Sequence, residues 1–264
     1  MRGHYTYYFI YSSIKNHELC YCTSRYPDRD FVWRGTIVSN GDVGYCGRKE
    51  KERLAFTGTN HGSIEQIGGD WYVFYHRLTH KSAYSRQACA EKNTIRADGS
   101  IPQVEMTSCG LNGAPLRARG TYPAAIACNL TRGRMPHAAN GLCKKDIPFI
   151  TERGGETYIT AIRSGTKVGY KYFAFNGQTK LEVSVRGNFR GRVRVLLDGK
   201  DCASIALSPH KDWTECETML NYAGTAALVL LFEGRGRAEL RELRFLELRG
   251  KINDGRTSSL RYAV

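Results

Sequence analysis

Hydrophobic and polar residues alternate along many short stretches of this chain, and glycine-rich turns separate these stretches. The clearest case lies between residues 57 and 76. It predicts a short strand over Ser63–Ile67, a turn at Gly68–Asp70 and a strong strand over Trp71–His76. Glycine supplies the positive φ that a tight turn requires, so we expect the two strands to pair as a hairpin. His61 stands just before the first strand, where a sheet edge can deliver a side chain into a site.

A similar aromatic strand occurs 64 residues earlier in the chain. Tyr7–Ser12 matches Trp71–His76, and each is followed by a polar turn and a further predicted strand, over Glu18–Ser24 and Ser82–Cys89. The offset exceeds the roughly 40–50 residues of common propeller blades, and the glycine-rich, charged insert at 40–54 accounts for the excess. The repeat predicts successive β-propeller blades, with the two aromatic strands as equivalent central strands of four-stranded sheets. Aromatic strands of a β-sandwich are the alternative.

Strand patterns restart near residue 157, after a connector at 129–145 that has little periodicity. They recur roughly every 8 to 12 residues, a spacing typical of a sandwich. The predicted strands cover Thr157–Ile162, Gly169–Phe175, Thr179–Arg186, Arg192–Leu197, Ala203–Leu207, Ala226–Phe232 and Ala238–Leu246. Because no strong amphipathic helix appears, we predict an all-β protein with a blade-like part at 1–150, a β-sandwich at 151–250 and a tail at 251–264.

The net charge of +14 raises the question of a nucleic-acid partner. The 39 lysines and arginines are spread along the whole chain, however, and no nucleic-acid motif accompanies them. The most clustered arginines alternate with apolar residues, as on an exposed strand face; they are Arg235, Arg237, Arg241, Arg244 and Arg249. We therefore expect no nucleic-acid partner. No apolar run approaches the ~18 residues of a membrane helix, so we expect no membrane partner either.

The cysteines and the N-terminus bear on the cellular compartment of the protein. Nine cysteines are an odd number, and they show no CxxC…CxxC spacing. We read them as reduced residues, which favours a cytoplasmic location. The sequence enters a predicted strand soon after Met1, so we expect no secretory signal.

Two family resemblances combine these observations. The stretch at 57–76 closely resembles the fifth blade of the five-bladed β-propellers of glycoside hydrolase family 43. The sandwich resembles a family 6 carbohydrate-binding module, which is a jelly roll. The segments that carry this second resemblance are Lys180–Gly187, Gly191–Asp198, Trp213, Gly224–Leu228 and Leu230–Gly234. The resemblances imply late blades of a partial five-bladed β-propeller followed by a jelly-roll β-sandwich.

Family 43 enzymes hydrolyse O-glycosidic bonds of arabinose- and xylose-containing plant polysaccharides with inversion, so the resemblance implies a plant cell-wall oligosaccharide or polysaccharide as partner. Inversion uses one carboxylate as base and one carboxylic acid as acid, about 6.5–9.5 Å apart. In the family the acid glutamate precedes the strand equivalent to Tyr7–Tyr11, but only Met1–Thr6 precede it here and none is acidic. The resemblance thus implies catalytic residues upstream of Met1, a chain truncated at its N-terminus, and no activity for the chain as given. The alternative is that Glu65 or Glu91 has taken over the role of a catalytic carboxylate.

Three residues match site positions of the family. His61 matches a histidine that faces the central channel and contacts a calcium ion or its waters, so we expect substrate binding and a metal contact there. Arg86 matches an arginine that reaches the substrate pocket, and a guanidinium suits sugar hydroxyls. His17, beside Glu18, is a third candidate for substrate binding. The alternatives are a capping histidine, a surface arginine and plain turn residues, respectively.

The sandwich departs from its family in one region. Such modules usually carry a polar ligand contact and an aromatic residue near their last strand, where this chain has Leu240–Leu243. Trp213 is the only tryptophan in this half of the chain, and it is either a core residue or a sugar-stacking platform. A sandwich that packs without binding sugar is therefore an alternative, and so is a non-catalytic carbohydrate-binding or assembly protein.

Overall fold

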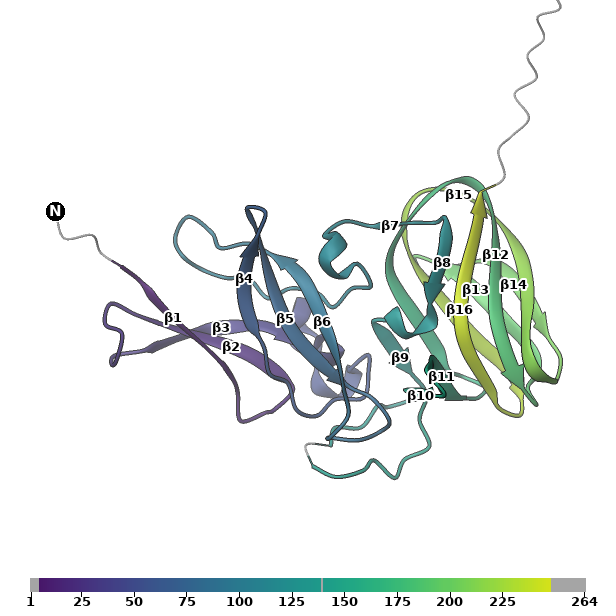
Figure 1. Ribbon diagram of the computed structural model, residues 1–264, viewed down its shortest axis with the longest axis horizontal. Helices are drawn as coiled ribbons and strands as arrows, with labels where there is room; N and C mark the ends of the chain where they lie inside the picture. Colours follow the sequence, from purple (N-terminus) through teal and green to yellow (C-terminus); the bar gives the residue numbers. More distant parts are fainter. Residues whose placement is uncertain (1–4, 139, 248–264) are drawn as a thin grey trace, which may run out of the picture.

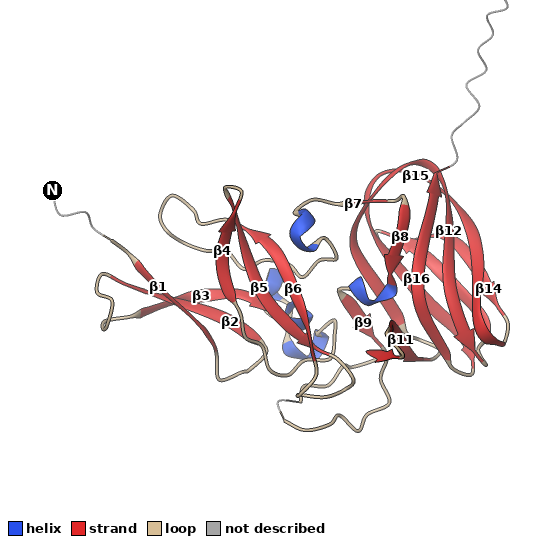
Figure 2. Ribbon diagram, in the orientation of Figure 1, coloured by secondary structure: helices blue, strands red, loops and turns tan. Residues whose placement is uncertain are grey.

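The protein is described by a computed structural model that covers residues 5–138 and 140–247; the expected tail at 251–264 lies outside these residues. Within them, the regular elements are β-strands and a few short 3-10 helices (Figure 2), which confirms the predicted all-β class. In the same residues, no helix combines the length and the apolar character needed to cross a membrane.

Two three-stranded antiparallel sheets form the N-terminal part, and the second lies between the first and the sandwich (Figure 1). The first sheet contains β1 (Tyr7–Ser12), β2 (Glu18–Ser24) and β3 (Val32–Ser39). The second sheet contains β4 (Ser63–Ile67), β5 (Asp70–Leu78) and β6 (Arg86–Asn93). The hairpin of β4 and β5 turns where predicted, at Gly68 and Gly69, which both have positive φ.

The aromatic strands β1 and β5 lie in separate sheets, as two blades require. The prediction that they are equivalent central strands of four-stranded sheets is wrong for the described residues, because β5 is central whereas β1 is an edge strand. Assignment of the sheets to a propeller remains a prediction. The sheets share one apolar core, to which β2, β3 and β5 contribute Leu19, Tyr21, Ile37, Val38, Val73 and Tyr75.

Three 3-10 turns connect the two sheets. They are η1 (Asn40–Asp42), η2 (Tyr45–Gly47) and η3 (Glu50–Glu52), and they occupy the charged insert identified in the sequence. Asn40 and Asp42 are almost fully buried. Although the segment has little regular structure, it therefore places polar side chains inside the molecule.

The outer face of the first sheet carries exposed aromatic side chains. Phe9 is 55% exposed and Trp33 is 61% exposed, and Phe9 packs against Tyr11 and Phe31. Strand β1 also leaves one edge without a partner strand among the described residues. Apolar faces and open edges of this kind favour association.

We therefore expect the chain alone to self-associate at high concentration. Light scattering after size-exclusion chromatography measures this directly. Replacing Phe9 and Trp33 by lysine should shift the chain toward the monomer, because the charges oppose stacking of two such faces. Replacing the exposed Leu142, which lies outside this face, is the matched control. A wild-type chain that stays monomeric at every concentration would contradict the expectation.

The C-terminal sheet has the order β10-β11-β16-β12-β15-β13-β14. Its strands are β10 (Phe149–Arg153), β11 (Glu156–Ile162), β12 (Lys167–Gly187), β13 (Arg190–Leu197), β14 (Lys200–Leu207), β15 (His210–Arg235) and β16 (Ala238–Glu247). All the strands predicted from residue 157 onward lie within these elements. The sheet folds over on itself into the predicted jelly-roll sandwich (Figure 1).

Two long strands connect the layers of the sandwich. The sequence pattern divided β12 into two strands, but the chain continues through Gly177, and β15 bends beside it at Gly224. Both glycines have positive φ, which residues with a Cβ rarely adopt. The C-terminal half of β12 pairs with β16, whereas the C-terminal half of β15 pairs with β13. Each long strand therefore changes layer at its bend.

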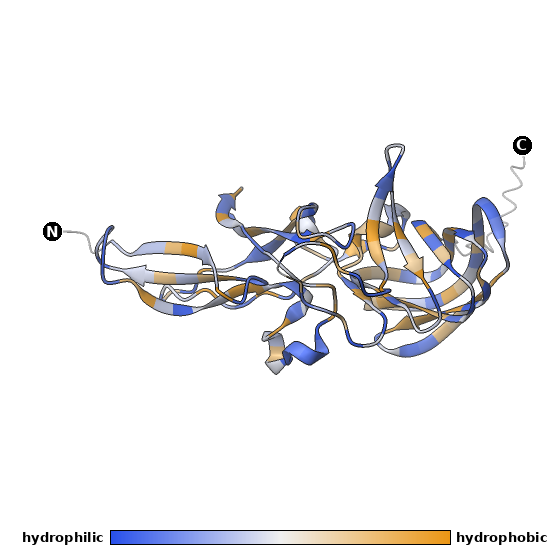
Figure 3. Ribbon diagram, turned by 90° about the horizontal axis from the view of Figure 1, so that it is seen from below, coloured by the Kyte–Doolittle hydropathy of each residue, from blue (hydrophilic) through white to orange (hydrophobic). Residues whose placement is uncertain are grey.

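A large apolar core fills the sandwich, and hydrophobic positions alternate with hydrophilic ones along its strands (Figure 3). Phe173 and Phe245 meet at its centre with ring centroids 4.7 Å apart. Tyr122 packs edge-on against both rings, although the sequence places it in the first part of the chain.

Residues 116–131 add three short strands to the sandwich. They are β7 (Leu116–Arg117) and β9 (Asn129–Thr131), which pair with β12, and β8 (Gly120–Pro123), which pairs with β16. The turn η4 (Gly110–Asn112) precedes this segment, and η5 (Ala124–Ile126) lies within it, between β8 and β9. The boundary at residue 150 remains a prediction, but part of the first segment completes the second core.

Candidate functional site

The predicted site histidine forms a pair with a second histidine. His61 is exposed and precedes β4, and its Nδ1 lies 3.3 Å from Nε2 of His76 on β5. The two rings stack with centroids 5.5 Å apart. The register explains the contact: Ser63 pairs with Phe74, so continuing the hairpin by two residues places His61 opposite His76.

Two neighbours of His61 fix its approach to β5. A Cβ added to Gly62 would lie 1.8 Å from the carbonyl oxygen of Phe74, so only glycine permits this close passage. The fully buried Asn60 accepts a hydrogen bond from the backbone N–H of His76 at 3.3 Å. The side chain of Asn60 also donates to the carbonyl oxygen of His17 at 3.4 Å, which connects the second sheet to the first.

Arg86 lies on the same face of the second sheet as His76. It begins β6, where Leu78 pairs with Arg86 and His76 pairs with Ala88, so the two side chains are diagonal neighbours. Burial, the positive charge of Arg86 and the ring of His61 together lower the pKa of His76 to about 4. His76 is therefore neutral at neutral pH. We call His61, His76 and Arg86 the His–Arg patch.

His17 lies beneath the surface. It occupies the turn between β1 and β2, is only 2% exposed, and its Nδ1 lies 2.9 Å from Oγ of Ser39. Its ring packs edge-on against His137, with centroids 5.6 Å apart. Burial is the main cause of the lowered pKa of His17, and His137 adds to it. This geometry favours support of neighbouring residues over the predicted direct contact with substrate.

The two alternative carboxylates do not join the patch. Glu65 is an exposed residue of β4. Glu91 on β6 is buried and projects from the face opposite to Arg86, where it accepts hydrogen bonds from Tyr75 and Thr107. Burial raises the pKa of Glu91 to about 7. Within the described residues, no carboxylate pairs with His61, His76 or Arg86. The patch can therefore bind and donate hydrogen bonds, but it lacks an acid–base pair of carboxylates.

Two arginine side chains cover the ring of Trp213, the tryptophan of the sandwich. The guanidinium carbon of Arg186 lies 4.2 Å from the ring centroid of Trp213, and that of Arg241 lies 5.0 Å away. Trp213 also donates its indole N–H to Glu156 at 3.2 Å. The side chain is half-buried, so it is neither a core residue nor an open platform on which a sugar could stack.

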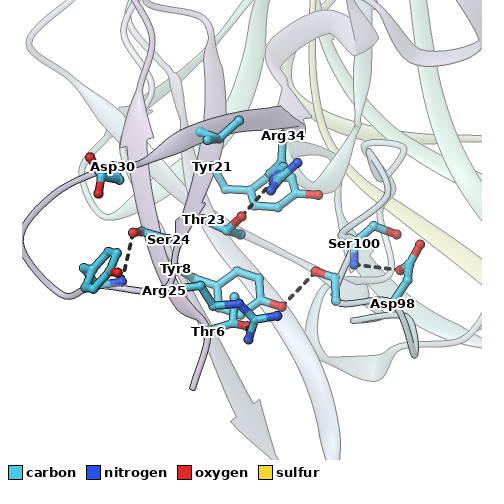
Figure 4. A pocket seen from close by; sticks show the side chains of 13 residues that line it. Thr6, Tyr8, Tyr21, Thr23, Ser24, Arg25, Asp30, Arg34, Asp98 and Ser100 are labelled. Carbon is cyan, nitrogen blue, oxygen red and sulfur yellow. Dashed lines mark hydrogen bonds between the residues drawn. The ribbon is translucent and has the colours of Figure 1, made fainter. Parts of the chain in front are cut away.

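The molecule also has a hollow of about 500 Å³ between the first sheet and the turn at 96–100 (Figure 4). Tyr8 and Tyr21 stack along it, and Tyr8 donates to the carbonyl oxygen of Gly99 at 2.8 Å. Tyr8 pairs with Thr23 near the open end of the β1–β2 hairpin, whereas His17 lies at its closed end. None of the predicted site residues His17, His61 and Arg86 lines this hollow.

Sequence reasoning named His61 and Arg86 as candidate site residues but did not include His76. The signal was present, since the glycine turn fixes the register that places His76 opposite His61. Asn60 and His137 gave no such signal, because their partners lie 43 and 120 residues away in the chain: His17 contacts both.

Fold and site together describe a two-part protein. Two small antiparallel sheets present the His–Arg patch, and a jelly-roll sandwich follows. No protein-family model matches the chain. A curated protein of Thermoclostridium stercorarium, named xylosidase/arabinosidase, is 41% identical over 248 residues. The match covers 89% of this chain and 52% of that protein, so the chain spans about half the length of this relative.

Two solved structures are similar to the chain with lower identity. One is a family 43 arabinoxylan arabinofuranohydrolase from Bacillus subtilis in complex with cellotetraose, which is 20% identical with a TM-score of 0.47 and covers 92% of this chain and 52% of that one. The other is a family 6 carbohydrate-binding module from Clostridium cellulolyticum in complex with xylose, which is 16% identical with a TM-score of 0.42 and covers 50% of this chain and 99% of that one.

The identity with the Thermoclostridium stercorarium protein runs through both parts of the chain. The chain thus resembles, as predicted, a glycoside hydrolase of family 43 followed by a family 6-like sandwich.

Calcium binding was expected from the resemblance. A further family 43 structure, a β-xylosidase/α-arabinofuranosidase from a compost microbial metagenome, is described as a calcium-free form. Among the residues that the structure describes here, no group of three or more His, Cys, Asp or Glu side chains could hold a metal ion. Calcium prefers six to eight oxygen ligands, so such side chains alone do not form a calcium site among the described residues.

Proposed function

We propose that this chain forms part of a glycoside hydrolase that cleaves O-glycosidic bonds of arabinose- or xylose-containing plant polysaccharides with inversion. The observation that carries the proposal is the 41% identity with a xylosidase/arabinosidase along 89% of the chain. The His–Arg patch supplies the substrate contacts in this proposal. His76 and Arg86 lie on the adjacent strands β5 and β6, and His61, in the loop before β4, contacts His76.

In this proposal the patch binds and orients a pentose unit. The guanidinium of Arg86 has a fixed fork of N–H donors that suits sugar hydroxyls and carboxylates. His61 adds an exposed imidazole, and buried His17 and Asn60 hold the loops beneath it. Positioning of this kind lowers the barrier because the sugar no longer has to find the reactive geometry by chance.

Proton transfer requires groups beyond this patch. An inverting glycosidase needs two carboxyl groups on opposite sides of the scissile bond. Since no carboxylate pairs with the patch in the described part of the chain, we propose that the acid and the base reside elsewhere in a longer protein. A calcium ion in the central channel would likewise take its oxygen ligands from outside the described residues.

We therefore expect the 264-residue chain alone to hydrolyse nitrophenyl α-L-arabinofuranoside and β-D-xyloside no faster than buffer. General acid and base assistance contribute about 10²- to 10⁴-fold each, and His61 and Arg86 cannot replace both. Release of nitrophenol by repurified protein measures this. Robust turnover would contradict the expectation, and Glu65→Gln and Glu91→Gln would then identify the carboxylate.

The proposal as a whole is tested by joining this chain to the part of the Thermoclostridium stercorarium relative that it does not match. The chimera should hydrolyse at least one of the two nitrophenyl glycosides. A folded chimera that binds arabinoxylan but never hydrolyses it would support the other function considered from the sequence, a non-catalytic carbohydrate-binding or assembly protein.

A further inference from the structure

The His61–His76 pair contains a hydrogen bond whose direction decides what His61 offers to a ligand. Nδ1 of His61 and Nε2 of His76 lie 3.3 Å apart. A neutral imidazole carries one N–H donor and one nitrogen acceptor. One of these two nitrogens must therefore hold the proton while the other accepts it, and each arrangement leaves a different group on the outer nitrogen of His61.

The second nitrogen of His76 distinguishes the two arrangements. Nδ1 of His76 is buried and has no hydrogen-bond partner. If Nε2 of His76 accepted the bond, Nδ1 would carry a buried N–H without a partner, which is costly and rare. If Nε2 donates, Nδ1 is an unprotonated acceptor, which is tolerated better. The enclosed position of Nδ1 thus favours His76 as the donor.

The backbone of His76 holds the ring in this position. Its N–H donates to Oδ1 of Asn60 at 3.3 Å, and its carbonyl oxygen accepts from Nδ2 of Asn40 at 3.1 Å. Both asparagines are almost fully buried. Buried side chains therefore engage both the backbone N–H and the carbonyl oxygen of His76, whereas His61 lies on an exposed loop.

We propose that His76 is a positioning residue that fixes His61 in the tautomer with its proton on Nε2. His61 then presents an N–H donor at the surface, and its acceptor nitrogen is occupied by His76. Such a ring recognises an oxygen acceptor, such as a sugar hydroxyl, and it has no free lone pair for a cation. This differs from the metal contact expected for His61 from the sequence. The sugar as ligand rests on the proposed function; the tautomer does not.

Nitrogen NMR of the full chain, labelled with ¹⁵N-histidine, tests the proposal without substrate. The spectra should show a ring proton attached to Nε2 of His76 that also couples, across the hydrogen bond, to Nδ1 of His61. Nδ1 of His61 should resonate as an unprotonated nitrogen. The variants His61→Gln and His76→Gln assign the signals by their loss. A proton attached to Nδ1 of His61, or two rings with no coupling and a free-solution tautomer mixture, would overturn the proposal.

Two substitutions of His76 separate positioning from mere structure. The amide of His76→Gln can still donate from a similar place, so His61 should keep its Nε2–H tautomer. His76→Phe keeps an aromatic ring but removes the donor, so His61 should relax to a tautomer mixture while the remaining amide spectrum stays that of a folded chain. If both variants leave the His61 tautomer unchanged, His76 does not fix it. Because no turnover is measured, this result is independent of whether the chain belongs to an active glycosidase.

Discussion

Replacing Lys171 by methionine should lower the free energy of unfolding by about 3–5 kcal/mol, the usual cost of removing one partner of a buried ion pair. Lys171 on β12 bonds to Asp42 at 2.7 Å and to Glu105 at 2.8 Å. Burial alone would lower the pKa of Lys171, but Asp42 and other neighbours raise it above its ordinary value, so the amine is charged. The variant leaves Asp42, which is 1% exposed, buried without its cation. Urea unfolding followed by tryptophan fluorescence measures the change.

The matched control is Lys180→Met, on the same strand. Lys180 also bonds to two carboxylates, Glu182 and Glu217, but it is more exposed. Exposed ion pairs contribute less than about 1 kcal/mol. Because Asp42 belongs to the N-terminal part and Lys171 to the sandwich, the larger loss would also show that the two parts stabilise each other. Equal losses in the two variants would contradict this interpretation.

The second large effect is a loss of stability with rising pH, caused by Glu91. Burial raises the pKa of Glu91 from 4.5 to about 7 in the folded protein. A raised folded-state pKa means that the folded chain holds a proton which the unfolded chain releases. The associated stability is fully present below pH 4.5 and is lost as the pH rises through about 7. At about 1.4 kcal/mol per pKa unit, the loss amounts to about 3 kcal/mol.

Glu91→Gln should remove most of this pH dependence, because the amide stays neutral and can keep hydrogen bonds with Tyr75 and Thr107. Urea unfolding between pH 5 and pH 8.5 gives the free energy of unfolding of both proteins. Their difference should grow with pH in favour of the variant. Glu65→Gln, an exposed change on the same sheet, should run parallel to the wild type. Parallel curves for Glu91→Gln would show that Glu91 stays ionised in the folded protein.

Local patterns predicted much of the fold. The Gly68–Gly69 turn and the alternation beside it define the β4–β5 hairpin, because both signals act over a few residues. Strand β3 was missed, since Arg34 and Gly35 interrupt its apolar pattern. The extra strands at 116–131 were missed as well, because they form only by pairing with β12 and β16, far along the chain.

The candidate site also depends on both local and distant contacts. His61 and Arg86 were proposed by resemblance, and the position of His76 opposite His61 follows from the register of one hairpin. The burial of His17 depends on Ser39 and His137, which the fold brings from two distant segments. The covering of Trp213 by Arg186 and Arg241 also needs strands that meet only in the folded sandwich. The spacing of residues along the sequence does not indicate such contacts.

The most direct test of the proposed glycosidase function is kcat/KM of the chimera with the Thermoclostridium stercorarium relative, measured on nitrophenyl α-L-arabinofuranoside and β-D-xyloside. We predict turnover by the chimera and a loss of about 10²-fold or more in His61→Ala and in Arg86→Ala, because each removes a positioned donor. His210→Ala, which changes a histidine of the sandwich, should stay within about twofold of the unsubstituted chimera, since it removes no donor of this kind. A folded chimera without turnover, or one in which His61→Ala and Arg86→Ala behave like His210→Ala, would contradict the account.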